Sequence, residues 1–146
     1  MEEAPVTKPS VPVAVEGTLL IVDDVPENLS VLGGLLRGIG YRVKAANSGR
    51  AALRYAGQEP RPDLILLDVM MPDLSGLEVL ETIKKQLKSP PPVVFLSAAG
   101  RIDDIEEGLK AGAFKYLVKP IARATLIETV KSALEWRLKA TRRRIY

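Results

Sequence analysis

The chain has 146 residues, and its 21 lysine and arginine residues against 18 aspartate and glutamate residues give a formal net charge of +3. It contains no cysteine and no histidine, which excludes disulfide bonds, zinc sites built on thiolate or imidazole ligands, and a histidine general base. No apolar run reaches the roughly 18 residues that a transmembrane helix needs, and the acidic start does not resemble a secretory signal, so we expect a cytoplasmic protein of one domain.

Residues 1–17 contain three prolines and end at Gly17, which predicts a flexible leader. From residue 18 onward, short apolar segments rich in β-branched residues alternate with stretches in which apolar residues recur at helical spacing. The apolar segments predict five strands. They are Leu19–Val22, Tyr41–Ala45, Leu64–Leu67, Val93–Leu96 and Phe114–Val118.

A helical pattern follows each predicted strand. The first follows Pro26, a residue that suits the first turn of a helix. The third follows a capping box formed by Ser75 and Glu78, and we expect a similar box, Thr125 with Glu128, at the fifth. The helical segments are marked by Leu29, Leu32, Leu36 and Ile39; by 51–56 after Ser48; by Leu77, Leu80, Ile83 and Leu87; by Ile102, Ile105 and Leu109; and by Leu126, Ile127, Val130 and Leu134.

This alternation is a (βα)₅ pattern, which favours a parallel five-stranded sheet with helices on both faces, a doubly wound three-layer α/β fold. The almost wholly apolar strands agree, because strands covered on both faces have no polar side. We place this domain at residues 18–138. A sheet of this kind has its binding site at the carboxyl ends of its strands, near the point where the strand order reverses.

Polar side chains of complementary chemistry stand at four of these strand ends. The first strand ends at Asp23 and Asp24, the third at Asp68, the fourth at Ser97, and the fifth at Lys119. Three clustered carboxylates repel one another, which predicts a bound cation, and all-oxygen ligands suit Mg²⁺. A carboxylate can attack phosphorus and form an aspartyl phosphate, while a lysine and a hydroxyl can bind the phosphoryl oxygens.

Each of these residues alone also has an ordinary structural explanation, as a helix cap, a turn residue or a surface side chain. Their joint placement favours a site for phosphoryl transfer. A phosphohydrolase with an aspartate nucleophile is disfavoured, because Met70 stands where a second acid is expected. A nucleotide-binding domain is disfavoured too, because no glycine-rich loop follows the first strand. A scaffolding domain that is not phosphorylated stays open as the alternative.

The motifs as a group resemble the receiver domain of bacterial two-component response regulators, including the chemotaxis regulators. The resemblance covers about residues 18–138 and implies the flavodoxin-like strand order 2-1-3-4-5. The segments that carry it are Leu19–Asp24, Asp68–Gly76, Val94–Ala98 and Gly112–Pro120.

The resemblance also implies roles for individual residues. Asp68 would be the phosphoacceptor, with Asp23, Asp24, Asp68 and the backbone carbonyl of Met70 as the Mg²⁺ ligands. Lys119, Ser97 and the backbone amide of Ala98 would bind the phosphoryl group, and Pro120 would follow a cis peptide bond. Ser97 and Tyr116 would form a switch, in which the phosphoryl group draws Ser97 inward and Tyr116 turns into the vacated space.

The implied partners are a sensor histidine kinase or a phosphotransfer protein, because this chain has no histidine of its own. The switched surface would be the fourth helix, fifth strand and fifth helix, through which a homodimer could form. The domain would catalyse only its own phosphorylation and dephosphorylation. Residues 139–146 form a basic tail or the start of a linker to an output domain, and we expect neither a membrane nor nucleic acid as a partner of the domain itself.

Overall fold

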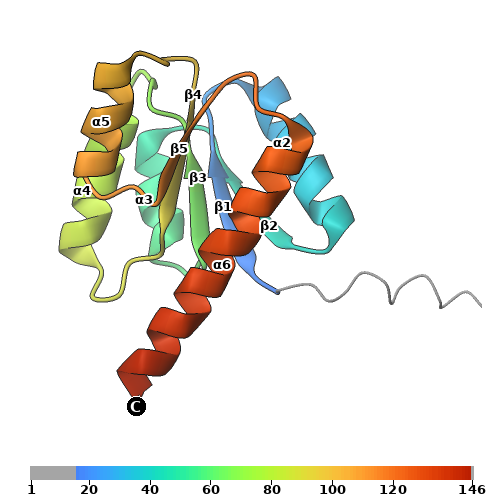
Figure 1. The fold of residues 1–146 in the computed structure, drawn as a ribbon, viewed down its shortest axis with the longest axis vertical. Helices are drawn as coiled ribbons and strands as arrows, with labels where there is room; N and C mark the ends of the chain where they lie inside the picture. Colours follow the sequence, from blue (N-terminus) through green and yellow to red (C-terminus); the bar gives the residue numbers. More distant parts are fainter. Residues whose placement is uncertain (1–15, 146) are drawn as a thin grey trace, which may run out of the picture.

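The computed structural model of the protein describes residues 16–145, with side-chain positions for residues 16–141. Most of the predicted leader therefore lies outside the described residues. Strands and helices alternate along the described chain (Figure 1). The strands are β1 (Thr18–Val22), β2 (Arg42–Ala46), β3 (Leu64–Leu67), β4 (Val93–Ser97) and β5 (Lys115–Val118), and the helices are α2 (Pro26–Ile39), α3 (Gly49–Ala56), α4 (Gly76–Gln86), α5 (Ile102–Lys110) and α6 (Arg123–Ile145).

The strands form one parallel sheet in the order β2-β1-β3-β4-β5, which confirms the predicted fold. From β1 the chain moves to one side to form β2 and then to the other side to form β3. The loops after β1 and β3 therefore leave the carboxyl edge of the sheet in opposite directions, and sheets of this kind bind their ligands at that point.

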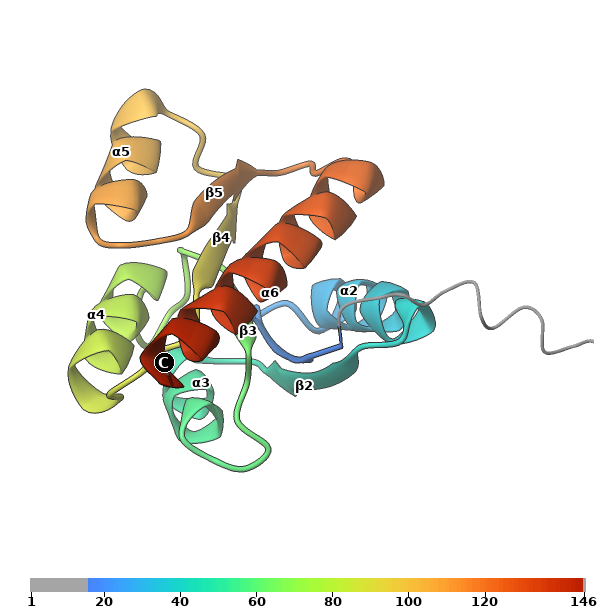
Figure 2. The same ribbon diagram turned by 60° about the horizontal axis from the view of Figure 1, so that its bottom comes forward.

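Alternate residues of the central strands face opposite sides of the sheet. Leu20 and Val22 join an apolar core with residues of α3 and α4, whereas Leu19 and Ile21 join a second core with residues of α2 and α6. Figures 1 and 2 show the two helical layers, α3, α4 and α5 on one side and α2 and α6 on the other. Burial on both faces explains why these strands are apolar throughout.

Most element boundaries fall within one or two residues of the prediction. Strand β2 begins at Arg42 instead of Tyr41, because the Tyr41 amide donates to the carbonyl of Leu36 at 3.2 Å and so completes the end of α2. Gly40 makes this turn with a φ of 123°, a conformation that favours glycine. Strand β5 likewise begins one residue later than predicted, at Lys115.

The start of α6 corrects one prediction. The helix begins at Arg123, and the amide of Leu126 donates to the carbonyl of Ala122 at 3.0 Å, so Thr125 lies inside the first turn. The predicted capping box of Thr125 with Glu128 is therefore wrong. The box predicted at the start of α4 is present, with both of its reciprocal hydrogen bonds.

Helix α6 continues without a break across residue 138, the predicted end of the domain, and reaches Ile145. Its Arg137 side chain donates to the backbone carbonyls of Ser89 and Pro90 at 3.1 and 3.0 Å. Beyond this anchor the helix projects past the end of the sheet (Figures 1 and 2). Across the described residues, no helix is both long enough and apolar enough to span a bilayer.

Candidate functional site

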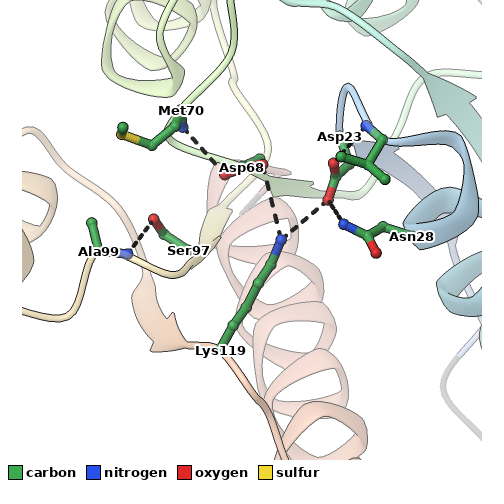
Figure 3. Close-up of polar contacts among 8 residues, drawn as sticks. Asp23, Asn28, Asp68, Met70, Ser97, Ala99 and Lys119 are labelled. Atoms are coloured by element: carbon green, nitrogen blue, oxygen red, sulfur yellow. Dashed lines mark hydrogen bonds and ion pairs between the residues drawn. The ribbon is translucent and has the colours of Figure 1, made fainter.

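The carboxyl edge of the sheet brings the predicted site residues together. Asp23 and Asp68 directly follow β1 and β3, Ser97 is the last residue of β4, and Lys119 directly follows β5. Figure 3 shows Asp23, Asp68 and Lys119 pointing toward one another from three different loops. The parallel sheet accounts for this convergence, since all its strands end at the same edge.

Asp23, Asp24 and Asp68 each offer a carboxylate oxygen that lies within 4.8 Å of those of the other two. Among the described residues this is the one group of three acids close enough to hold a metal ion. Three carboxylates beside one lysine leave an excess of negative charge, and carboxylate oxygens are the donors that hard divalent cations prefer. The residues present thus fit a Mg²⁺ ion.

Lys119 joins two of these acids. Its Nζ lies 3.2 Å from Oδ2 of Asp23 and 3.9 Å from Oδ2 of Asp68. Asp23 is fixed further by the amide of Val25, which donates to its Oδ1 at 2.9 Å, and by the side chain of Asn28, which donates to its Oδ2 at 3.1 Å. The peptide bond between Lys119 and Pro120 is cis, as the resemblance implied.

The Asp68 carboxyl group is largely buried, with 12% of its side chain exposed. Burial raises its pKa above the ordinary value. The hydrogen bond from the Met70 amide, at 3.2 Å, and the charge of Lys119 lower the pKa, while the charges of Asp23 and Asp24 add to the increase. Burial thus outweighs the favourable contacts, and a cation near this carboxylate would favour its ionised form.

Ser97 is completely buried, and its Oγ accepts a hydrogen bond from the amide of Ala99 at 3.1 Å. Ala98, between the two, is exposed in the loop. Met70 contacts Asp68 through its backbone amide, and its side chain is exposed to solvent. The proposed uses of the Met70 carbonyl and the Ala98 amide stay predictions.

Tyr116 lies inside the domain in this structure. Only 9% of the residue is exposed, its ring centroid is 5.8 Å from that of Phe95, and its hydroxyl donates to the carbonyl of Ala99 at 2.6 Å. The ring fits beside Gly108 of α5, where an added Cβ would lie 2.8 Å from it. Tyr116 therefore contacts the same loop residue, Ala99, whose amide binds Ser97.

Two further residues support the site in ways that the sequence did not predict. Asn28 holds Asp23 from the first turns of α2, but its polar side chain carried no distinguishing signal. Gly76 packs directly against Asp68, because an added Cβ at Gly76 would lie 2.5 Å from the carbonyl oxygen of Asp68. The capping box of Ser75 and Glu78 predicted where α4 begins, but it gave no sign that Gly76 lies so close to Asp68.

A doubly wound sheet of this order, with acids, a lysine and a buried serine at its carboxyl edge, is the arrangement of a receiver domain. Comparison with known proteins agrees, because the model of the response regulator receiver domain family matches residues 19–131. The chain belongs to this family.

Individual relatives point the same way. The chain is 44% identical over 119 residues to the transcriptional regulatory protein PrrA of Mycobacterium leprae, covering 82% of this chain and 50% of that protein. It is 40% identical over 119 residues to a probable cyclic di-GMP phosphodiesterase of Vibrio cholerae, covering 81% of this chain and 26% of that protein. The chain thus spans between a quarter and a half of the length of these relatives.

Among solved structures, the fold is similar to a chain of the CheX-CheY-BeF3-Mg²⁺ complex from Borrelia burgdorferi. The TM-score is 0.72 with 30% sequence identity, and the match covers 79% of this chain and 87% of that one.

Proposed function

We propose that Asp68 accepts a phosphoryl group from a phosphohistidine of a partner histidine kinase or phosphotransfer protein. The observation that carries the proposal is the grouping of the Asp23, Asp24 and Asp68 carboxylates within 4.8 Å, with Lys119 in contact with two of them. An Oδ atom of ionised Asp68 attacks phosphorus, the bond from phosphorus to the imidazole nitrogen of the donor breaks, and that nitrogen later takes a proton from solvent.

Asp23, Asp24, Asp68 and the carbonyl of Met70 would hold Mg²⁺, which when bound neutralises charge between the acceptor and the phosphoryl oxygens. Lys119 offers an ammonium group to a phosphoryl oxygen. The Ser97 hydroxyl and the Ala98 amide donate to the others. The Borrelia burgdorferi complex, which contains BeF3 and Mg²⁺ beside a similar fold, supports this arrangement.

The proposed output is a change on the face formed by α5, β5 and α6, which includes the strand that carries Tyr116. Three large apolar residues on α5 and β5 are exposed there, namely Ile102 (73%), Leu109 (45%) and Val118 (38%). Large apolar residues exposed on neighbouring elements are candidates for an interaction surface, and a second copy of this chain is the partner that we propose for them. The transfer would take place in the cytoplasm, with no turnover of a separate substrate.

The test is incubation of the protein with Mg²⁺ and either acetyl phosphate or a beryllofluoride salt. We expect acetyl phosphate to add the mass of one phosphoryl group at Asp68, located by peptide mass spectrometry, and Asp68→Asn to abolish it. An unmodified wild-type protein would favour the alternative of a scaffolding domain, and modification that persists in Asp68→Asn would place the acceptor elsewhere.

A further inference from the structure

The loop that follows the acceptor strand is tied to a helix from an earlier part of the chain. In this β3–α4 loop, residues 68–75, Oδ1 of Asp73 accepts the amide hydrogen of Gly49 at 3.0 Å and Oδ2 accepts that of Arg50 at 3.0 Å. The third amide of α3, that of Ala51, donates to Oγ of Ser48 at 3.1 Å. Two of the first three amides of α3 are therefore satisfied by a residue more than 20 positions further along the chain.

Glycines bring the loop close to the structures on either side of it. An added Cβ at Gly49 would lie 2.7 Å from Cβ of Leu74, so the loop backbone lies directly on the first residue of α3. At the end of the loop, the amide of Gly76 donates to the carbonyl of Val69 at 2.7 Å. Within the same loop, the amide of Met70 donates a hydrogen bond to Oδ1 of Asp68.

Asp73 lies outside the group of three acids and touches none of them. Its contacts are charge-assisted hydrogen bonds at the positive end of a helix dipole, which are among the stronger polar contacts in proteins. The amides of Arg50 and Gly49 lower the pKa of the Asp73 carboxyl group, which means that these hydrogen bonds favour its ionised form. Each oxygen of the Asp73 carboxylate accepts from one amide, so the two hydrogen bonds together fix the orientation of the carboxylate.

We propose that Asp73 is a positioning residue for the acidic site. Its two hydrogen bonds to α3 hold the β3–α4 loop so that Asp68 and the backbone of Met70 are presented together to a divalent cation. The inference rests on the function proposed above, because it concerns how that cation is bound. A residue that only fixes a metal ligand changes metal affinity without contacting the metal.

The competing explanation is that Asp73 only caps α3. Ser48 provides a matched control, because its hydroxyl caps the same helix from a residue outside the loop. Removing either cap destabilises α3, but only the loss of Asp73 also releases the loop. The two roles therefore separate when Mg²⁺ affinity and thermal stability are measured on the same variants.

We would compare the full chain with Asp73→Ala, Asp73→Asn and Ser48→Ala, measuring Mg²⁺ binding by isothermal titration calorimetry and the Tm without Mg²⁺. The loss of a residue that holds a metal ligand in place typically lowers metal affinity about tenfold to a hundredfold. Because Asp73 is exposed, we expect an effect at the lower end of this range. We expect Asp73→Ala to raise the Kd for Mg²⁺ about tenfold. Asp73→Asn, which keeps one acceptor oxygen, should give an intermediate Kd, and Ser48→Ala should lower the Tm with the Kd unchanged.

Wild-type affinity in Asp73→Ala would overturn the inference, as would an equal loss of affinity in Ser48→Ala. A wild-type protein that binds no Mg²⁺ at all would instead contradict the proposed function, and the inference would fall with it.

Discussion

The surroundings of Asp68 favour its protonated form, because burial outweighs the Met70 amide and Lys119. The folded protein therefore holds a proton on this carboxyl group more tightly than the unfolded chain does. By linkage, this contribution to folding stability is present in full below the ordinary pKa of 3.8 and is lost as the pH rises through the raised pKa of the folded state. At neutral pH the ionised Asp68 thus weakens the fold.

We predict that Asp68→Asn, which removes this charge, is more stable than the wild-type protein at neutral pH in the absence of Mg²⁺. The difference should shrink as the pH falls to about 3, where Asp68 is protonated in both states. Urea unfolding midpoints across this range measure it. Mg²⁺ should then stabilise the wild-type protein more than the variant, because it binds the folded state preferentially. A variant less stable than wild type at neutral pH would contradict the argument.

The sequence was sufficient to predict the charged site residues, because each stands at the end of an apolar strand. Asp23, Asp68 and Lys119 needed only the (βα)₅ pattern to be brought together. The support around them was not predictable in the same way. Asn28 and Asp73 are ordinary polar residues in sequence, and their contacts depend on how the loops lie once the sheet has formed.

At the scale of the elements, α5 packs closely on β5 because Gly108 has no side chain. Tyr116 lies inward because Gly108 leaves room for its ring, and an added Cβ would come within 2.8 Å of Tyr116 and 3.2 Å of Phe95. Buried rings in such contact cannot give way without moving a neighbour. The inward position of Tyr116 therefore requires the space that α5 leaves at Gly108, and the sequence of α5 gives no sign of this role.

We predict that Gly108→Ala displaces the Tyr116 ring and costs about 1–3 kcal/mol of folding stability, as overpacking of a core usually does. Near-ultraviolet circular dichroism and denaturant unfolding report the two effects. Gly34→Ala is the matched control, since an added Cβ there meets nothing within 4 Å and should stabilise α2 by about 0.5–1 kcal/mol. An unchanged tyrosine signal in Gly108→Ala would show that the space beside residue 108 can hold both the Tyr116 ring and a methyl group.

The wrongly predicted start of α6 shows a limit of local patterns. Thr125 and Glu128 have the spacing of a capping box, yet the helix begins at Arg123. In α4 the same pattern, Ser75 with Glu78, does form the box. The pattern states only which side chains could cap, whereas the loop that leads into the helix decides where the first turn starts.

For the whole molecule, the apolar residues exposed on α5 and β5 matter most for the proposed self-association. Helix α5 and strand β5 lie away from α2 (Figures 1 and 2), so a substitution on α2 can test whether the surface is specific. Val31 on α2 is itself an exposed apolar residue and offers a control of the same kind.

We predict that beryllofluoride with Mg²⁺ converts the wild-type protein into a dimer, measured by sedimentation velocity. Ile102→Asp and Val118→Asp should each prevent this, because a buried unpaired charge is strongly unfavourable at an interface. Val31→Asp should leave the dimer intact. A wild-type protein that remains monomeric with beryllofluoride bound would exclude this mode of output.

Helix α6 begins four residues after Lys119 and then runs for 23 residues to the opposite end of the domain (Figure 1). At 1.5 Å per residue it is about 35 Å long. A tilt of about 5° at its first turn would move its last turn by about 3 Å, the geometry of a lever with its pivot beside the proposed phosphoryl site. The carboxyl end of α6 would therefore move much further than its first turn.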